Sequence, residues 1–295
     1  MWQKIPKILK SSFNVISIIL IIALWSGISY YVISNISKIS SSVANNTTTD
    51  TSNTEEPSEP ENCNVYGINL HGDVVTYNSN DAYNDQYDVI LDQTSADDII
   101  WAVNEAQDND KIKAIVVEID SYGGSGVAGE EMMTAFKQSK KPVIAFIRNA
   151  GLSAAYLAAT GAETIFASNF SDVGSIGVTM SYLQEAEKNT KEGLSYVNLS
   201  SGAYKDTGNP ARTLSEDEKQ LIMRDIKIGH DYFVKLVSEN RNLSIETVKK
   251  IADGSSMMGE AALRNGLIDK IGIYPDVVDF LSDKIGTPAD ICWKN

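Results

Sequence analysis

Hydrophobic and polar residues alternate in blocks along most of the chain, and the period changes from block to block. Apolar runs of four to six residues occur at 65–70, 114–119, 142–147 and 164–167, which is the length and composition of buried strands. Between them, apolar residues recur every three to four positions, as in helices with one buried face. Strands alternating with helices predict an α/β fold on a largely parallel sheet, with functional loops at the carboxyl ends of the strands.

Polar residues at the block boundaries predict where several helices begin. Ser95 followed by Asp98, and Ser215 followed by Glu218, have the spacing of helix N-terminal caps. Ser244 predicts a further helix that ends by Gly254, and residues 258–266 predict a short helix with a glycine stop. We expect residues 71–73 to turn the chain after the first strand, and residues 172–178 to form a loop leading into another strand.

The first long apolar segment has no polar face. Residues 13–33 contain no charged residue and are long enough to cross a bilayer as a helix. Lys4, Lys7 and Lys10 precede the segment and only Lys38 follows it closely, so the positive-inside rule puts the N-terminus in the cytoplasm. We expect a retained transmembrane anchor. A cleavable signal peptide ending near Ala44 is the alternative.

Residues 34–62 separate this segment from the rest of the chain. Much of this stretch is rich in Ser, Thr, Asn, Glu and Pro, a composition that cannot bury enough apolar surface to fold. The sequence therefore predicts a cytoplasmic N-terminus at 1–12, an anchor at 13–33, a flexible linker at 34–62 and an extracytoplasmic domain at 63–295. The expected location is the cell membrane, crossed once.

Charge and cysteine content exclude several classes of function. The chain carries 25 Lys and Arg against 39 Asp and Glu, a net charge of −14, which argues against nucleic acid as a partner. Two cysteines are too few for a zinc site, and metal-binding or nucleotide-binding motifs are absent from the sequence, so we expect no cofactor. Cys63 and Cys292 flank the predicted domain; a disulfide and two unrelated thiols both remain open.

Ser153 is the candidate nucleophile. It follows the apolar run 142–147 and precedes a small-residue run, 154–160, which together predict a strand-to-helix turn with an exposed hydroxyl. A helix N-terminal cap is the alternative role for this serine.

A serine hydroxyl needs a base, and the chain offers few. His71 and His230 are the only histidines, and neither has the loop placement expected of a catalytic base. A lysine side chain acts as a base when desolvation disfavours its charged form. Lys205 lies in a polar loop, 201–210. Taken alone, it would be read as a surface lysine.

Five stretches, in order between residues 65 and 272, resemble the signal peptide peptidase A family (SppA-type, serine peptidase family S49). They are Asp120-Ser121-Tyr122-Gly123-Gly124; Ser153-Ala154-Ala155-Tyr156; Gly174-Ser175-Ile176-Gly177-Val178; Ser201-Gly202-Ala203-Tyr204-Lys205-Asp206 with Pro210 and Arg212; and residues 258–269.

The resemblance implies a ClpP/crotonase-like fold of repeated β-β-α units and a role for each matching residue. Ser153 would be the nucleophile and Lys205 the general base. Ser175 would hydrogen-bond Lys205. Gly123 and Gly124 would form the oxyanion turn, with the N–H groups of Gly124 and Ser153 as donors. Family members form rings in which neighbouring subunits share the serine and the lysine, which implies a homo-oligomer here.

The function implied is that of a membrane-anchored Ser-Lys peptidase that cleaves hydrophobic peptides, such as remnant signal peptides, through an acyl-enzyme. A crotonase-like acyl-thioester enzyme and a catalytically inactive membrane scaffold are the alternatives. Two departures from the family pattern bear on substrate preference. Ala154-Ala155 stands where the family usually has two glycines, and Tyr122 stands where proline is frequent.

Overall fold

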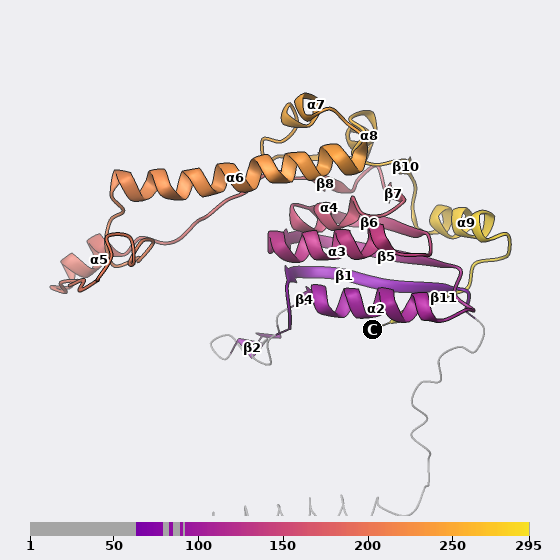
Figure 1. Cartoon of the computed structure of the whole chain (residues 1–295), viewed down its shortest axis with the longest axis horizontal. Coiled ribbons are helices and arrows are strands. Elements are labelled where there is room, and N and C mark those ends of the chain that lie inside the picture. The colour runs from indigo at the N-terminus through magenta and orange to yellow at the C-terminus, as the bar shows by residue number, and fades with distance from the viewer. Residues whose placement is uncertain (1–62, 79–82, 85–88, 91, 295) are drawn as a thin grey trace, which may run out of the picture. The chain divides into compact units, whose positions relative to one another are not determined.

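A nine-stranded, mostly parallel sheet forms the centre of the computed structural model, which describes residues 63–78, 83–84, 89–90 and 92–294 (Figure 1). Its main strands are ordered β10-β7-β6-β5-β1-β11. In chain order they are β1 (Val65–Val75), β5 (Ala114–Gly124), β6 (Val143–Leu152), β7 (Thr164–Ala167), β10 (Lys270–Ile271) and β11 (Ile291–Lys294). The α/β prediction is confirmed.

Short strands pair with the carboxyl ends of β1 and β6. β4 (Gln93–Ser95) pairs with the end of β1, and β8 (Asp172–Gly174) pairs with the end of β6. β9 (Ser256–Met258) runs antiparallel to β8. A separate hairpin consists of β2 (Tyr83–Asn84) and β3 (Val89–Ile90).

Helices cover both faces of the sheet, and each strand divides its side chains between them. Ile115, Val117 and Ile119 of β5 join one apolar cluster, whereas Ala114 and Val116 join the other. This alternation explains why parallel strands read as continuous apolar runs. The helices packed into the first cluster include α2 (Ala96–Asp108), α3 (Gly126–Gln138), α4 (Ala154–Ala159) and α6 (Glu216–Arg241), and α9 (Tyr274–Ile285) packs into the second.

The predicted helix starts are confirmed. Ser95 accepts a hydrogen bond from the Asp98 N–H at the start of α2. Ser215 and Glu218 form both halves of a capping box at the start of α6. The remaining helices are short: α5 (Ala186–Lys191), α7 (Ile245–Lys249) and α8 (Gly259–Arg264).

Two local predictions were wrong. Residues 71–73 do not turn the chain. β1 continues through a bulge at Gly72 (φ 65°), because Asp73–Val75 still pair with β4. The segment 172–178 does not lead into a following strand; its first three residues are themselves β8, because β6 and β9 flank them.

An exposed arm, residues 178–213, connects the sheet to α6. It contains α5, and the N-terminal part of α6 extends away from the sheet to meet it (Figure 1). The buried apolar residues of α6 lie in its C-terminal half, between Phe233 and Val237. The arm's large apolar residues are exposed: Val178, Met180, Tyr182, Leu183, Leu194, Tyr196, Val197, Leu199 and Tyr204.

A disulfide joins the two ends of the described chain. Cys63 and Cys292 are bonded, with Cα atoms 5.7 Å apart. The bond lies beside the parallel pairing of β1 with the edge strand β11.

The predicted cytoplasmic N-terminus (1–12), anchor (13–33) and linker (34–62) lie outside the described residues. Within the part of the chain that the structure describes, no helix combines the length and the apolar character needed to cross a membrane.

Candidate active site

Ser153 lies at the turn between β6 and α4, in a backbone conformation that few residues other than glycine adopt. Its φ is 51° and its ψ is −122°. Among the described residues only Ser153, Ser175 and Asn242 combine a side chain with a positive φ, and Asn242 ends a helix. Such strain costs free energy and concentrates at functional sites. Both strained serines belong to the predicted catalytic set.

The glycine turn at the end of β5 packs directly against Ser153. The Ser121 hydroxyl donates to the Gly72 carbonyl (2.6 Å) and accepts from the Gly123 N–H (3.0 Å). Gly123 has φ 105°, and a Cβ there would lie 2.7 Å from the Ser153 Cβ. Only glycine fits this position, because the backbone approaches the serine so closely.

Backbone N–H groups beside Ser153 are arranged differently from the prediction. The Ser153 N–H, which the sequence analysis assigned to the oxyanion, donates to the Gly174 carbonyl (2.8 Å) and therefore already has a partner. The Ser125 N–H donates to Val74 on β1 (2.7 Å). Because successive N–H groups of a strand point to opposite edges, the Gly124 N–H points toward the β6 side. Ala154 begins α4, so its N–H has no partner within the helix.

Two cavities meet at Ser153. The smaller, about 360 Å³, has mostly apolar walls, and the larger, about 890 Å³, contains Ser175 and several charged groups. Ser153, Gly177, Val178 and Thr179 line both. The side chains specific to the smaller cavity come from α3, α4 and α6: Val127, Glu130, Leu157, Tyr232, Phe233 and Leu236.

Within one chain, the structure brings together most of the predicted site but not its lysine. Gly124 and Ser175 each line a cavity with Ser153, and the Ser175 hydroxyl donates to the Gly254 carbonyl (3.0 Å). Lys205 lies in the arm, is exposed, and lines neither cavity. A single chain therefore does not bring Lys205 together with the other residues predicted to be catalytic.

Each histidine has a polar contact with a group other than Ser153. His71 is exposed and its Nδ1 contacts the Asp92 carboxylate (2.6 Å). His230 lines the larger cavity, with its Nε2 against the Ala252 carbonyl (2.8 Å). This contact gives the His230 ring a structural partner.

One helix face contributes cavity residues that the sequence analysis did not identify. Met223, Ile226, Lys227 and His230 all line the larger cavity. They follow helical spacing on α6, three to four positions apart. Their spacing could have shown that these residues share one face of the helix. It does not show which face of a long helix lines a cavity.

Known proteins are similar to this chain in sequence and in fold. The model of peptidase family S49 matches residues 135–287. A predicted protease of Methanocaldococcus jannaschii is 33% identical over 74% of this chain and 71% of its own length. A predicted signal peptide peptidase SppA of Enterococcus faecium is 30% identical over 69% of this chain and 61% of its own length.

A solved structure shares the fold at low sequence identity. The structure of a membrane-bound stomatin-specific protease, a mutant in complex with a substrate peptide, aligns with a TM-score of 0.52 at 15% identity. The alignment covers 80% of this chain and 93% of that one. The fold agrees with the sequence match, and the chain belongs to peptidase family S49, a family of serine peptidases.

Proposed function

We propose that this protein is a membrane-anchored serine peptidase in which Ser153 of one copy and Lys205 of a neighbouring copy form the catalytic dyad. The observation that carries the proposal is the division of the site. The strained serine lies at the junction of two cavities, whereas the lysine lies on an exposed loop outside both. A neighbouring copy supplies the missing base and, by covering it, removes it from water. Desolvation favours the neutral amine that can accept a proton.

The proposed reaction has two halves. The neutral Lys205 amine takes the proton of Ser153 Oγ, and Oγ attacks the scissile carbonyl carbon. The C–N bond then breaks, the leaving amine takes the proton from Lys205, and an ester to Ser153 remains. Lys205 next deprotonates a water molecule that attacks the ester carbon. This step releases the peptide acid and returns the proton to Ser153.

Backbone donors stabilise the negative charge that develops on the scissile oxygen. The Gly124 N–H points to the side of β5 on which Ser153 lies, and we assign the second donor to the Ala154 N–H in place of Ser153's own. Ser175 keeps lone pairs free to accept a hydrogen bond from Lys205, as the family resemblance implies. Preorganised donors of this kind each contribute roughly 10²–10³ in rate.

Hydrophobic peptides such as remnant signal peptides are the proposed substrates. The cavities that meet at Ser153 can accept the chain on the two sides of the scissile bond, and the smaller cavity has the apolar walls that an apolar side chain requires.

The membrane location rests on the sequence. The uncharged segment 13–33 is the proposed anchor, and the lysines before it place the catalytic domain outside the cytoplasm. Supporting this side of the membrane, the domain carries a disulfide, a bond that persists in oxidising compartments. The exposed apolar residues of the arm support contact with further copies, for which we propose a homo-oligomeric ring.

The test measures peptide hydrolysis by single and mixed variants. S153A and K205A should each reduce activity by at least about 10³-fold, whereas a coexpressed mixture of the two should recover part of it. K219A is the control, since Lys219 is an exposed lysine on α6 that pairs with Glu216. Full activity in K205A would reject Lys205 as the base. Loss of activity in K227A instead would point to a base in the same chain as Ser153, because Lys227 lines the larger cavity.

Failure of Ser153 to react with a peptidyl acylating inhibitor in the assembled protein would instead support an inactive scaffold. The family assignment favours the peptidase over an acyl-thioester enzyme.

A further inference from the structure

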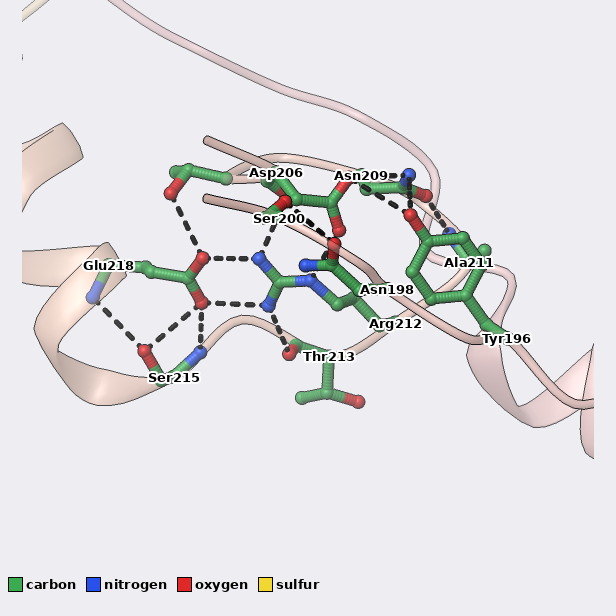
Figure 2. Close-up of polar contacts among 11 residues, drawn as sticks. Tyr196, Asn198, Ser200, Asp206, Asn209, Ala211, Arg212, Thr213, Ser215 and Glu218 are labelled. Atoms are coloured by element: carbon green, nitrogen blue, oxygen red, sulfur yellow. Dashed lines mark hydrogen bonds and ion pairs between the residues drawn. The ribbon is translucent and has the colours of Figure 1, made fainter. Parts of the chain in front are cut away.

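A charge cluster lies directly behind Lys205. Figure 2 shows the Arg212 guanidinium between the carboxylates of Asp206 and Glu218. Arg212 Nε donates to Asp206 Oδ2 (2.9 Å), and Nη1 donates to Glu218 Oε2 (2.9 Å). Arg212 Nη2 contacts the other Glu218 oxygen and also donates to the Asp206 carbonyl (2.8 Å). The three residues of this cluster, Asp206, Arg212 and Glu218, belong to a segment that begins one residue after Lys205.

Glu218 fixes this cluster to α6. Its carboxylate accepts from the Ser215 N–H (2.9 Å) and from the Thr207 hydroxyl (2.9 Å). Only 3% of Glu218 is exposed, although it lies in the first turn of a helix whose neighbouring residues are exposed. A buried carboxylate is tolerated only with partners of this number and charge.

Further hydrogen bonds hold Asp206 from the arm. The Tyr196 hydroxyl donates to Asp206 Oδ1 (2.9 Å), and Asn209 Nδ2 donates to the same oxygen (3.0 Å). The arm around the cluster consists mainly of exposed side chains. The cluster therefore holds its part of an otherwise exposed segment to α6, and the exposed Lys205 directly precedes it.

We propose that Arg212, Asp206 and Glu218 are positioning residues that fix the backbone at Lys205 relative to α6, so that the lysine side chain enters a neighbouring copy's cavity in the correct geometry. This inference rests on the proposed shared dyad. Capping of α6 does not require Arg212 or Asp206, because Ser215 and Glu218 complete the capping box by themselves. The Arg212 fork adds the connection from that helix end to Asp206, the residue that follows Lys205.

Matched substitutions separate positioning from stability. R212K keeps the charge but loses the planar fork that holds two carboxylates. It should lower kcat by about 10²-fold with KM changed less than about threefold, since a displacement of ~1 Å costs this much. R241K is the control. Arg241, the last residue of α6, makes a fork to a single carboxylate, that of Asp269 (2.7 and 3.1 Å). R241K should lower thermal stability while kcat is retained.

Mixed assemblies show on which chain Arg212 acts. The parent mixture pairs an S153A chain, which donates the lysine, with a K205A chain, which donates the serine. R212K added to the S153A chain should remove the recovered hydrolysis, and R212K added to the K205A chain should remove much less.

Equal loss from both placements would overturn the inference, because Arg212 would then act through folding or assembly. A kcat for R212K within about twofold of wild type would overturn it as well. An inactive parent mixture, by contrast, would reject the shared dyad itself.

Discussion

At Ser153 the unusual conformation belongs to the backbone, and it accounts for the position of the hydroxyl. With φ 51° the chain leaves β6 and enters α4 within one residue, which points the serine side chain out of the turn. The Ser153 N–H is tied to Gly174, next to the second strained serine, Ser175. The strained turn at Ser153 is thus bonded to the last residue of β8, which directly precedes the second strained serine.

The close contact between Gly123 and Ser153 gives a prediction at this scale. G123A would put a methyl carbon 2.7 Å from the Ser153 Cβ and 3.0 Å from the Ala154 nitrogen. Acylation of Ser153 by a peptidyl inhibitor should slow by about 10²-fold, the typical effect of losing one oxyanion donor.

G193A is the matched control for that substitution. Gly193 also has a positive φ (75°), but a Cβ there meets no atom within 4 Å, so the variant reports the cost of backbone strain alone. An acylation rate for G123A close to that of G193A would contradict the assigned role of the turn.

At the scale of the element, the two halves of α6 have different tasks. Its C-terminal half buries Phe233, Val234 and Val237 in the core. Its N-terminal half is exposed and holds the cluster around Arg212 (Figure 2). The Arg212 guanidinium holds the pKa of the Glu218 carboxyl well below its usual range, with help from the Ser215 N–H. Arg212 and Asn209 lower the pKa of Asp206 in the same way.

These pKa shifts predict that acid loosens the base of the arm. A carboxyl whose pKa is lowered by folding stabilises the fold above its unfolded pKa, about 4.3 for Glu, and this contribution is lost as the pH falls further. Hydrogen exchange of the amides of 203–220, corrected for the intrinsic effect of pH, should accelerate in wild type below about pH 4.

In E218Q the same amides should already exchange faster at pH 7 and change less with acid. E216Q is the control on the same helical turn, since Glu216 is exposed and pairs only with Lys219 in the described contacts. An unchanged ratio of E218Q to wild-type exchange between pH 7 and pH 3 would contradict the prediction.

Sequence patterns located these elements better than they located the contacts between them. The Ser215–Glu218 spacing predicted the start of α6, because a capping box is local. It could not show that Glu218 also binds Arg212, since that contact depends on how the loop folds back. The pattern around Ser153 likewise predicted the turn but not the bond from its N–H to Gly174. The position of Lys205 relative to Ser153 has no local signal at all, because the lysine lies outside the cavities of its own chain.

At the scale of the whole described domain, the exposed arm carries the lysine that the cavities beside Ser153 lack. The apolar residues of the arm and the outward Lys205 lie on the same segment, 178–213. A contact that buries these apolar residues also removes Lys205 from water. Under the proposed function, hydrolysis therefore requires assembly, and a single chain is inactive.

The disulfide gives a prediction for stability at this scale. Cys63 and Cys292 are 229 residues apart, and closing so long a loop stabilises the fold by up to about 5 kcal/mol in the chain-entropy estimate. The C63S/C292S double variant should therefore have a lower Tm than oxidised wild type. A reducing agent should lower the Tm of wild type to a similar value and leave the double variant unchanged. Equal Tm values for oxidised and reduced wild type would contradict this.

The same bond makes residues 63–292 a closed covalent loop. A peptidase whose neighbours cut one of its own exposed loops would then lose no fragment, because both pieces stay joined through Cys63 and Cys292. The disulfide also changes how a force applied to the chain reaches the domain. A pull transmitted along the chain from before residue 63 reaches β11 through a covalent bond as well as through the hydrogen bonds between β1 and β11. The attachment point of the domain can therefore bear tension without separating its edge strand.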